Sequence, residues 1–166
     1  MGLPGAGKSA IAPLLAQRVG FEAVDLDEAV ERMAGMTVAA IFETRGEERF
    51  RDLEARALAE ALDRPRSVVA CGGGILVRPE NRARLEERAW VAWLTVDPVV
   101  AAARLARGAT PERPLLRGDP SGAALVALLA ERAAAYAAAA DVQVPASEGT
   151  PDAVAERIAA LWEALP

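Results

Sequence analysis

One short segment, Gly2 to Ser9, meets the whole pattern G-x-x-x-x-G-K-[S/T]. Glycines at these positions let backbone N–H groups turn inward around phosphate oxygens, and a following helix points its positive end at the same anion. The pattern predicts that Lys8 reaches the β- and γ-phosphates of ATP and that Ser9 offers its hydroxyl to Mg²⁺. The alternative, a glycine-rich surface loop, is disfavoured because the single lysine among the 19 basic residues falls in register with the pattern. The residues predicted to bind the nucleotide in this phosphate loop (residues 2–9) and just after it are Gly5, Ala6, Gly7, Lys8, Ser9 and Ala10.

Composition narrows the class of protein further. The 166 residues suit one domain, and no apolar run approaches the roughly 20 residues that a membrane helix needs. A formal charge of −5 argues against a nucleic-acid partner, and the absence of histidine excludes Ser-His-Asp triads. Cys71 is the only cysteine, so no internal disulfide forms. We expect a cytoplasmic monomer without a signal peptide that acts on a small molecule.

Apolar segments bounded by turn residues alternate along the chain between strand-like and helix-like patterns. This alternation predicts a three-layer α/β/α fold around a parallel sheet, of the P-loop kinase type. A Gly-, Pro- and Arg-rich stretch at about 107–122 reads as a mobile loop. The expected strands are 21–27, 67–71, 90–96 and 142–144, and the expected helices are 9–19, 28–34, 37–43, 47–62, 79–87, 97–106, 123–139 and 151–164.

The phosphate loop stands unusually close to the start of the sequence. Such a loop normally follows a buried central strand, but only Met1 precedes Gly2. We therefore expect the first central strand to be truncated or missing, with a groove in the sheet at its place. A start that lies too late in the gene explains this better than a sheet that lacks a strand.

Two carboxylates, Asp25 and Asp27, stand two residues apart at the end of an expected strand, where side chains reach the same side. One can serve Mg²⁺ through water, and the other can accept a hydrogen bond from a substrate hydroxyl. Taken alone, the same residues also suit a solvated strand end followed by a helix cap.

Further motifs follow the phosphate loop and the D-x-D pair in a fixed order. They are I-F-x-x-x-G-E-x-x-F-R at 41–51, G-G-G at 72–74, R-P-L-L at 113–116 and R-x-x-x-Y at 132–136. The ordered set resembles the shikimate kinase family over nearly the whole chain. The resemblance implies that ATP phosphorylates the 3-hydroxyl of shikimate, with Mg²⁺ as the metal.

The resemblance also implies roles for individual residues. Asp27 would hold the substrate hydroxyls and position the nucleophile, and Asp25 would reach Mg²⁺ through water. Arg51 and Arg132 would pair with the substrate carboxylate, a planar group suited to guanidinium contacts. The remaining implied roles are backbone approach to the substrate at Gly72, Gly73 and Gly74, charge neutralisation by Arg113 in a lid at about 107–122, and adenine contact by Arg107, with substrate-binding helices at about 28–62. Lys8, Asp27 and Arg113 would be the catalytic residues.

Two alternatives to this reading stay open. One is another small-metabolite kinase of the same fold, such as a gluconate kinase, although two arginines and a glycine triplet suit a carboxylate on a rigid ring better. The other is a kinase-like module that binds nucleotide but has lost catalysis. The missing first strand is the observation that suggests it. Ala10 stands where the family usually carries threonine, so a hydroxyl contact to the α-phosphate is expected to be absent.

Overall fold

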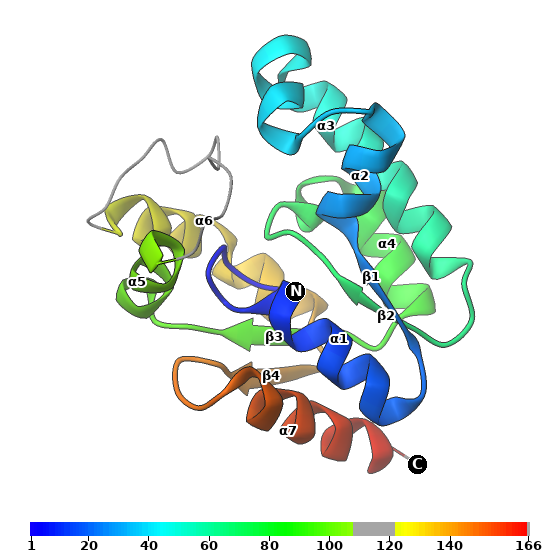
Figure 1. The fold of residues 1–166 in the computed structure, drawn as a ribbon, viewed down its shortest axis with the longest axis vertical. Coiled ribbons are helices and arrows are strands. Elements are labelled where there is room, and N and C mark those ends of the chain that lie inside the picture. The colour runs from blue at the N-terminus through cyan, green and yellow to red at the C-terminus, as the bar shows by residue number, and fades with distance from the viewer. Residues whose placement is uncertain (108–121, 166) are drawn as a thin grey trace.

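The computed structural model describes residues 1–107 and 122–165 of the chain (Figure 1). The elements in chain order are α1 (Lys8–Val19), β1 (Glu22–Asp25), α2 (Leu26–Ala34), α3 (Val38–Leu62), β2 (Ser67–Ala70), the 3₁₀ turn η1 (Ile75–Val77), α4 (Pro79–Arg88), β3 (Ala92–Thr95), α5 (Pro98–Arg107), α6 (Ala123–Ala139), β4 (Val142–Pro145) and α7 (Pro151–Glu163). None of the helices within the described ranges has the length and apolar character required to span a bilayer.

The strands form two parallel pairs. β1 pairs with β2, with Glu22 opposite Ser67 and Asp25 opposite Ala70. β3 pairs with β4, with Ala92 opposite Val142. Within residues 1–107 and 122–165, no strand joins β2 to β3. The predicted parallel α/β arrangement is confirmed, and the described part of the sheet is divided where the first central strand was expected to be missing.

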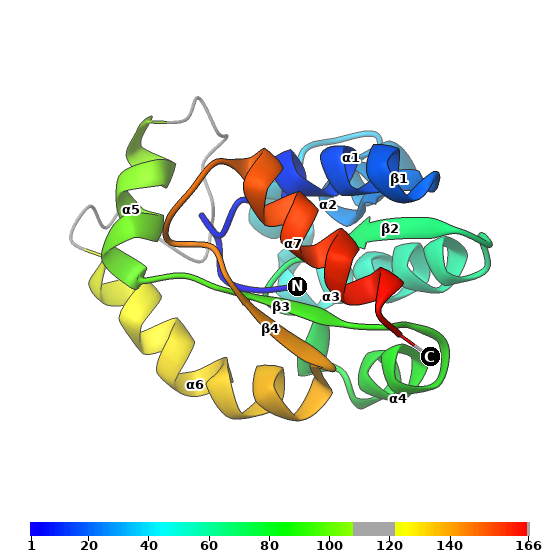
Figure 2. The ribbon, with the colours of Figure 1, turned by 90° about the horizontal axis from the view of Figure 1, so that it is seen from below.

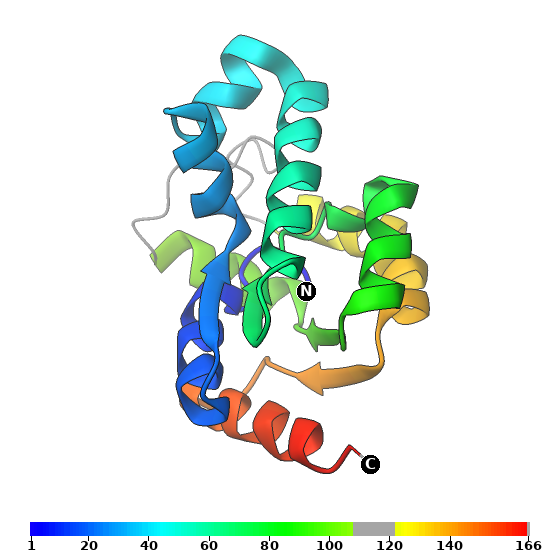
Figure 3. The same cartoon turned by 90° about the vertical axis from the view of Figure 1, so that its right-hand side faces the viewer.

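Helices cover both faces of the strands, as Figures 2 and 3 show from two directions. α1 and α7 pack against each other on one face, and α4 and α6 lie on the other. The core between these layers is almost wholly aliphatic, which suits strands that are covered on both sides. α2 and the first part of α3 project beyond the strands (Figure 1), so they form a separate wall above the strand ends.

The first residue runs alongside β3. The Leu94 N–H donates to the Met1 carbonyl oxygen at 2.9 Å, and the Met1 ammonium donates to the Ala92 carbonyl oxygen at 2.8 Å. Burial lowers the pKa of this ammonium to about 6; Cys71 opposes that shift, and the positive charge of Lys8 adds to it. The chain therefore enters the phosphate loop from an extended residue fixed to the edge of a strand.

The helical boundaries differ from the expected ones chiefly in α2, which begins at Leu26 rather than at residue 28, and in α3. The segments expected at 37–43 and 47–62 are joined as α3, with non-helical φ and ψ of 79° and 168° at Gly46, so the helix is kinked there. The predicted break at Gly35 is confirmed, because this glycine ends α2 in the left-handed conformation. Arg107 ends α5 and Gly122 caps α6, whereas Arg113 and the rest of the expected lid lie outside the described residues.

The buried amino terminus predicts a pH dependence of stability. The pKa of this amine is near 8 in the unfolded chain but about 6 in the folded chain. Between these two pH values the unfolded chain therefore binds more protons than the folded one. The free energy of unfolding should therefore be highest above pH 8 and fall by about 2 kcal/mol toward pH 6. Thermal denaturation between pH 6 and 8.5 measures this, in an interval without histidine titration.

A chain acetylated at the Met1 nitrogen is the control, because its terminus carries no ionisable amine. An unchanged pH profile after acetylation would show that other groups cause the dependence.

Candidate active site

The phosphate loop leads into α1 with its amide groups exposed to a ligand. Gly7 is the N-cap of this helix at φ 90°, with no side-chain cap and no acidic residue in the first turn. Gly5 also has a positive φ, of 80°, and a Cβ built there would lie only 2.5 Å from the Ala101 carbonyl oxygen. The loop is thus pressed against α5 in a conformation that requires glycine. An uncapped helix start without acids is a site for an anion such as phosphate.

Lys8 is held by the loop that it follows. Its Nζ donates to the carbonyl oxygens of Gly2 at 3.0 Å and Leu3 at 2.8 Å. Ser9 and Ala10 are exposed on the first turn of α1, and Ala6 is buried in the loop. The ammonium thus lies against the loop backbone and Ser9 is exposed at the helix start, which is compatible with the predicted contacts to phosphate and Mg²⁺.

Asp25 is the last residue of β1, as expected, whereas Asp27 lies beyond the strand, in α2. Asp25 is the N-cap of α2, and its Oδ1 accepts from the Asp27 N–H at 2.9 Å and the Glu28 N–H at 3.5 Å. The helix begins at Leu26 because this cap satisfies its first amide groups. Asp27 consequently lies in the first helical turn. The two carboxylates therefore do not reach the same side of one strand, and the helix cap that the alternative reading expected is confirmed for Asp25.

A buried ion pair lies on the inner face of α3. Arg51 is only 4% exposed, and its Nη1 donates to Glu54 Oε2 at 2.7 Å. The other edge of the guanidinium, Nε and Nη2, donates to Glu47 Oε1 at 3.2 and 2.9 Å. Burial raises the pKa of Glu54, whereas the Arg51 charge opposes that rise. The pair fixes the guanidinium in one orientation.

The glycine triplet lies against this pair. A Cβ on Gly72 would lie 3.3 Å from Glu54 Oε1 and 3.7 Å from Asp27 Oδ1. At Gly74 a Cβ would overlap the Arg51 guanidinium, so only glycine fits there. The position of a Gly73 Cβ lies 3.1 Å from the Gly2 carbonyl oxygen. The triplet therefore connects the Arg51–Glu54 ion pair to the phosphate loop.

Two residues of α6 complete the cluster. The Tyr136 hydroxyl is fully buried and donates to the Gly73 carbonyl oxygen at 2.7 Å. The Arg132 side chain is 11% exposed, and its Nη1 lies 3.6 Å from the Gly73 Cβ position. Its Nε is buried and makes no hydrogen bond within the described part of the chain. Such a donor suits an anion that enters the site.

The structure thus brings together most of the predicted substrate residues. Asp27, Arg51, the triplet 72–74 and Arg132 surround one point beside the phosphate loop. Arg107 is exposed at the end of α5, and Arg113 is outside the described residues. The described residues contain no cluster of three or more metal-binding side chains.

Sequence reasoning missed the partners of Arg51. Glu47 and Glu54 stand at i−4 and i+3 from it, spacings that place side chains together on a helix. These spacings were the signal in the sequence that could have indicated both glutamates as partners of Arg51. The Tyr136 contact had no comparable local signal, because it joins residues 63 positions apart.

The fold and the site together define a class. A phosphate loop opening an α/β domain, beside a cluster of two arginines and two carboxylates, is the arrangement of a P-loop kinase for a small anionic substrate.

The comparisons identify the family. The shikimate kinase family model matches residues 4–163. The shikimate kinase of Thermobifida fusca is 45% identical over 159 residues, which are 96% of this chain and 90% of that protein. A solved shikimate kinase from Acinetobacter baumannii, in complex with shikimate, is 33% identical with a TM-score of 0.88, over 99% of this chain and 92% of the other. A solved shikimate kinase from Bacteroides thetaiotaomicron is 28% identical with a TM-score of 0.88, over 98% of this chain and 96% of the other. The chain belongs to the shikimate kinase family.

The buried pair yields a prediction about stability. Glu54→Gln leaves the Arg51 charge buried beside a neutral amide, and loss of one partner of a buried pair costs about 3–5 kcal/mol. Urea denaturation of the variant should show a loss of about 3 kcal/mol, since Glu47 still contacts Arg51.

Glu47→Gln is the matched control, because Glu47 contacts the same arginine but is 50% exposed. Its loss should stay within about 1 kcal/mol. Equal losses in the two variants would contradict the importance of burial at Glu54.

Proposed function

We propose that the chain transfers the γ-phosphoryl group of ATP to the 3-hydroxyl of shikimate, giving shikimate 3-phosphate and ADP. The observation that carries this proposal is the buried Arg132 Nε, which makes no hydrogen bond to the described residues and has only the Glu131 carboxylate near it, at 3.7 Å, in a cluster that touches the phosphate loop through Gly73. A carboxylate supplies the acceptor that this nitrogen lacks. Membership of the shikimate kinase family agrees with a substrate that carries both a carboxylate and hydroxyls.

Arg132 and Arg51 would bind the carboxylate from two sides. The Nε–Nη2 edge of Arg51 already holds one carboxylate oxygen, that of Glu47. Glu47 is half exposed, and its side chain extends from the residue that follows the kink of α3 at Gly46. Its carboxylate would give way to that of the substrate, whereas Glu54 would keep the guanidinium in place from the buried side.

Asp27 would accept a hydrogen bond from the attacking hydroxyl. It lies in the first turn of α2, with Oδ1 3.7 Å from the Cβ position of Gly72, and its charge acts on Glu54. Phosphoryl transfer depends on the position of the nucleophile and on cations around the moving charge. Asp27 would provide the position, and Lys8 and Arg113 the cations.

The nucleotide would lie on Gly5, Ala6, Gly7, Lys8, Ser9 and Ala10, with Arg107 against the adenine. Mg²⁺ would be held by Ser9 and, through water, by Asp25, and would neutralise negative charge on the phosphates. Both supply oxygen atoms, the ligands that Mg²⁺ prefers. The exposed Ser9 hydroxyl suits this contact, and Asp25 would combine it with its role as a helix cap.

Residues 1–166 would form one kinase domain. Residues 107–122 would close over the nucleotide as a lid, and the helices within 28–62 would bind the substrate. The acidic chain would act as a cytoplasmic monomer without a nucleic-acid partner.

A coupled ADP-release assay tests the activity. ADP release should require shikimate and should stay at background with gluconate or without an acceptor. Turnover with gluconate alone would assign the chain to another small-metabolite kinase, and turnover with neither would leave a nucleotide-binding homologue without catalysis.

Asp27→Asn should lower kcat by about 10²-fold or more, because an amide neither holds the hydroxyl in the same way nor accepts its proton. The KM for ATP should hardly change. Asp152→Asn, on the exposed start of α7, is the control and should leave kcat intact. A kcat of wild-type size for Asp27→Asn would remove this carboxylate from the mechanism.

Arg132→Ala should chiefly raise the KM for shikimate, by about 10-fold or more, because it removes a charged ground-state contact. Arg56→Ala is the control, since Arg56 is exposed on α3 and pairs only with Glu60 among the described residues. A change confined to the KM for ATP would show that Arg132 serves the nucleotide instead.

A further inference from the structure

The Tyr136 side chain lies where three parts of the fold meet. It is fully buried on α6, its ring centroid lies 5.5 Å from a ring centroid of Trp93 in β3, and its hydroxyl donates to the Gly73 carbonyl oxygen at 2.7 Å. A buried phenol hydroxyl normally requires a hydrogen-bond partner, which the Gly73 carbonyl supplies. The hydrogen bond therefore joins α6 to the loop that follows β2, and β3 supports the ring.

The hydroxyl fits this place only because residue 73 is a glycine. A Cβ built on Gly73 would lie 2.5 Å from the Tyr136 hydroxyl oxygen, which is closer than a real Cβ atom approaches. Burial raises the pKa of this hydroxyl above its ordinary value, although the positive charge of Arg132 opposes the rise. The hydroxyl therefore stays protonated at neutral pH and acts as a hydrogen-bond donor.

Arg132 reaches the same point of the loop. It precedes Tyr136 by four residues, a spacing that places two side chains on one face of a helix. Its Nη1 lies 3.6 Å from the Gly73 Cβ position. Among the described residues, its only ion-pair partner is Glu131, at 3.7 Å, and that carboxylate is 69% exposed. Such an exposed pair orients a side chain weakly, so the buried contacts at Gly73 have the larger part in placing this guanidinium.

The two arginines of the site are connected through the glycine triplet. Arg51 belongs to α3, and its guanidinium fills the space beside Gly74. Gly73, the preceding residue, accepts the Tyr136 hydrogen bond. The backbone that packs against one arginine is thus fixed, one residue earlier, to the helix that carries the other.

We propose that Tyr136 is a positioning residue for the substrate carboxylate: through its hydrogen bond to Gly73 it holds Arg132 at the distance from Arg51 that a bound carboxylate requires. This inference rests on the proposed function, in which both arginines bind the carboxylate of shikimate. A planar carboxylate accepts hydrogen bonds from guanidinium groups in a narrow range of geometries. A shift of about 1 Å in a positioned group is enough to impair such a site.

Tyr136→Phe tests the inference, because it removes the hydroxyl and retains the ring against Trp93. The KM for shikimate should rise by about 5- to 10-fold, while kcat and the KM for ATP stay within about twofold of wild type. With shikimate methyl ester, which keeps the hydroxyls but lacks the carboxylate charge, the variant should have the KM of wild type. A general loss of packing would not produce a change confined to the carboxylate.

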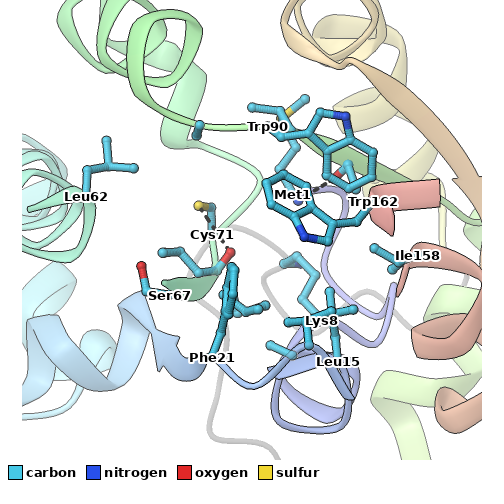
Figure 4. Close-up of a pocket in the computed structure, with 18 of the residues that line it drawn as sticks. Met1, Lys8, Leu15, Phe21, Leu62, Ser67, Cys71, Trp90, Ile158 and Trp162 are labelled. Carbon is cyan, nitrogen blue, oxygen red and sulfur yellow. Dashed lines mark hydrogen bonds between the residues drawn. The ribbon is translucent and has the colours of Figure 1, made fainter. Parts of the chain in front are cut away.

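A double-mutant cycle shows whether Tyr136 acts through Arg132. Tyr136→Phe added to Arg132→Ala should leave the KM for shikimate unchanged, because the group that Tyr136 positions is already absent. Ile158→Ala is the structural control. Ile158 is buried on α7 and lines an apolar pocket that neither Tyr136 nor Gly73 borders (Figure 4). Its truncation should lower Tm without changing either KM.

Three results would overturn this inference alone, with a wild type that still phosphorylates shikimate. They are an unchanged KM for shikimate in Tyr136→Phe, equal rises of the KM for shikimate and for its ester, and effects of Tyr136→Phe and Arg132→Ala that multiply in the double variant. A wild type that neither binds nor phosphorylates shikimate would overturn the proposed function, and this inference with it.

Discussion

The buried ion pair between Arg51 and Glu54 sets the shape of the substrate side of the site. Removing two charges from water costs free energy, and their mutual attraction offsets that cost only if their geometry is well defined. Here Glu54 Oε2 accepts a hydrogen bond from Arg51 Nη1 at 2.7 Å, while Glu47 accepts hydrogen bonds from the other edge of the guanidinium. The fixed guanidinium fills the space beside Gly74, which therefore has to be glycine. A feature that looks like flexibility in the sequence is thus a consequence of close packing against a charge.

The features that could be predicted from sequence are those with a local physical cause. The phosphate loop, the breaks at glycines and the alternation of strands with helices all follow from neighbouring residues. Asp25 shows the limit of such reasoning. Its spacing from Asp27 fits a strand end, but its side chain caps a helix, and the cap moves the start of α2 to Leu26.

Other features depend on contacts that the sequence does not display. Glu54 reads as one more acid on a helix rich in charges, and only its burial against the triplet 72–74 shows that it orients Arg51. Tyr136 was visible as part of a motif, but its contact with the Gly73 carbonyl joins α6 to a loop far away in sequence. The candidate site was therefore predictable as a set of ligand-binding residues, whereas the residues that hold this set in place were not.

The phosphate loop is attached to the rest of the fold through the backbone of its first residues. Lys8 is held by the carbonyl oxygens of Gly2 and Leu3, and that backbone is fixed to β3 through Met1. Gly73 lies against the Gly2 carbonyl from the other side. The same short stretch of backbone therefore contacts both the strand β3 and the substrate cluster. In-line transfer depends on the distance between the phosphates and the substrate, and this stretch connects the two places where they would bind.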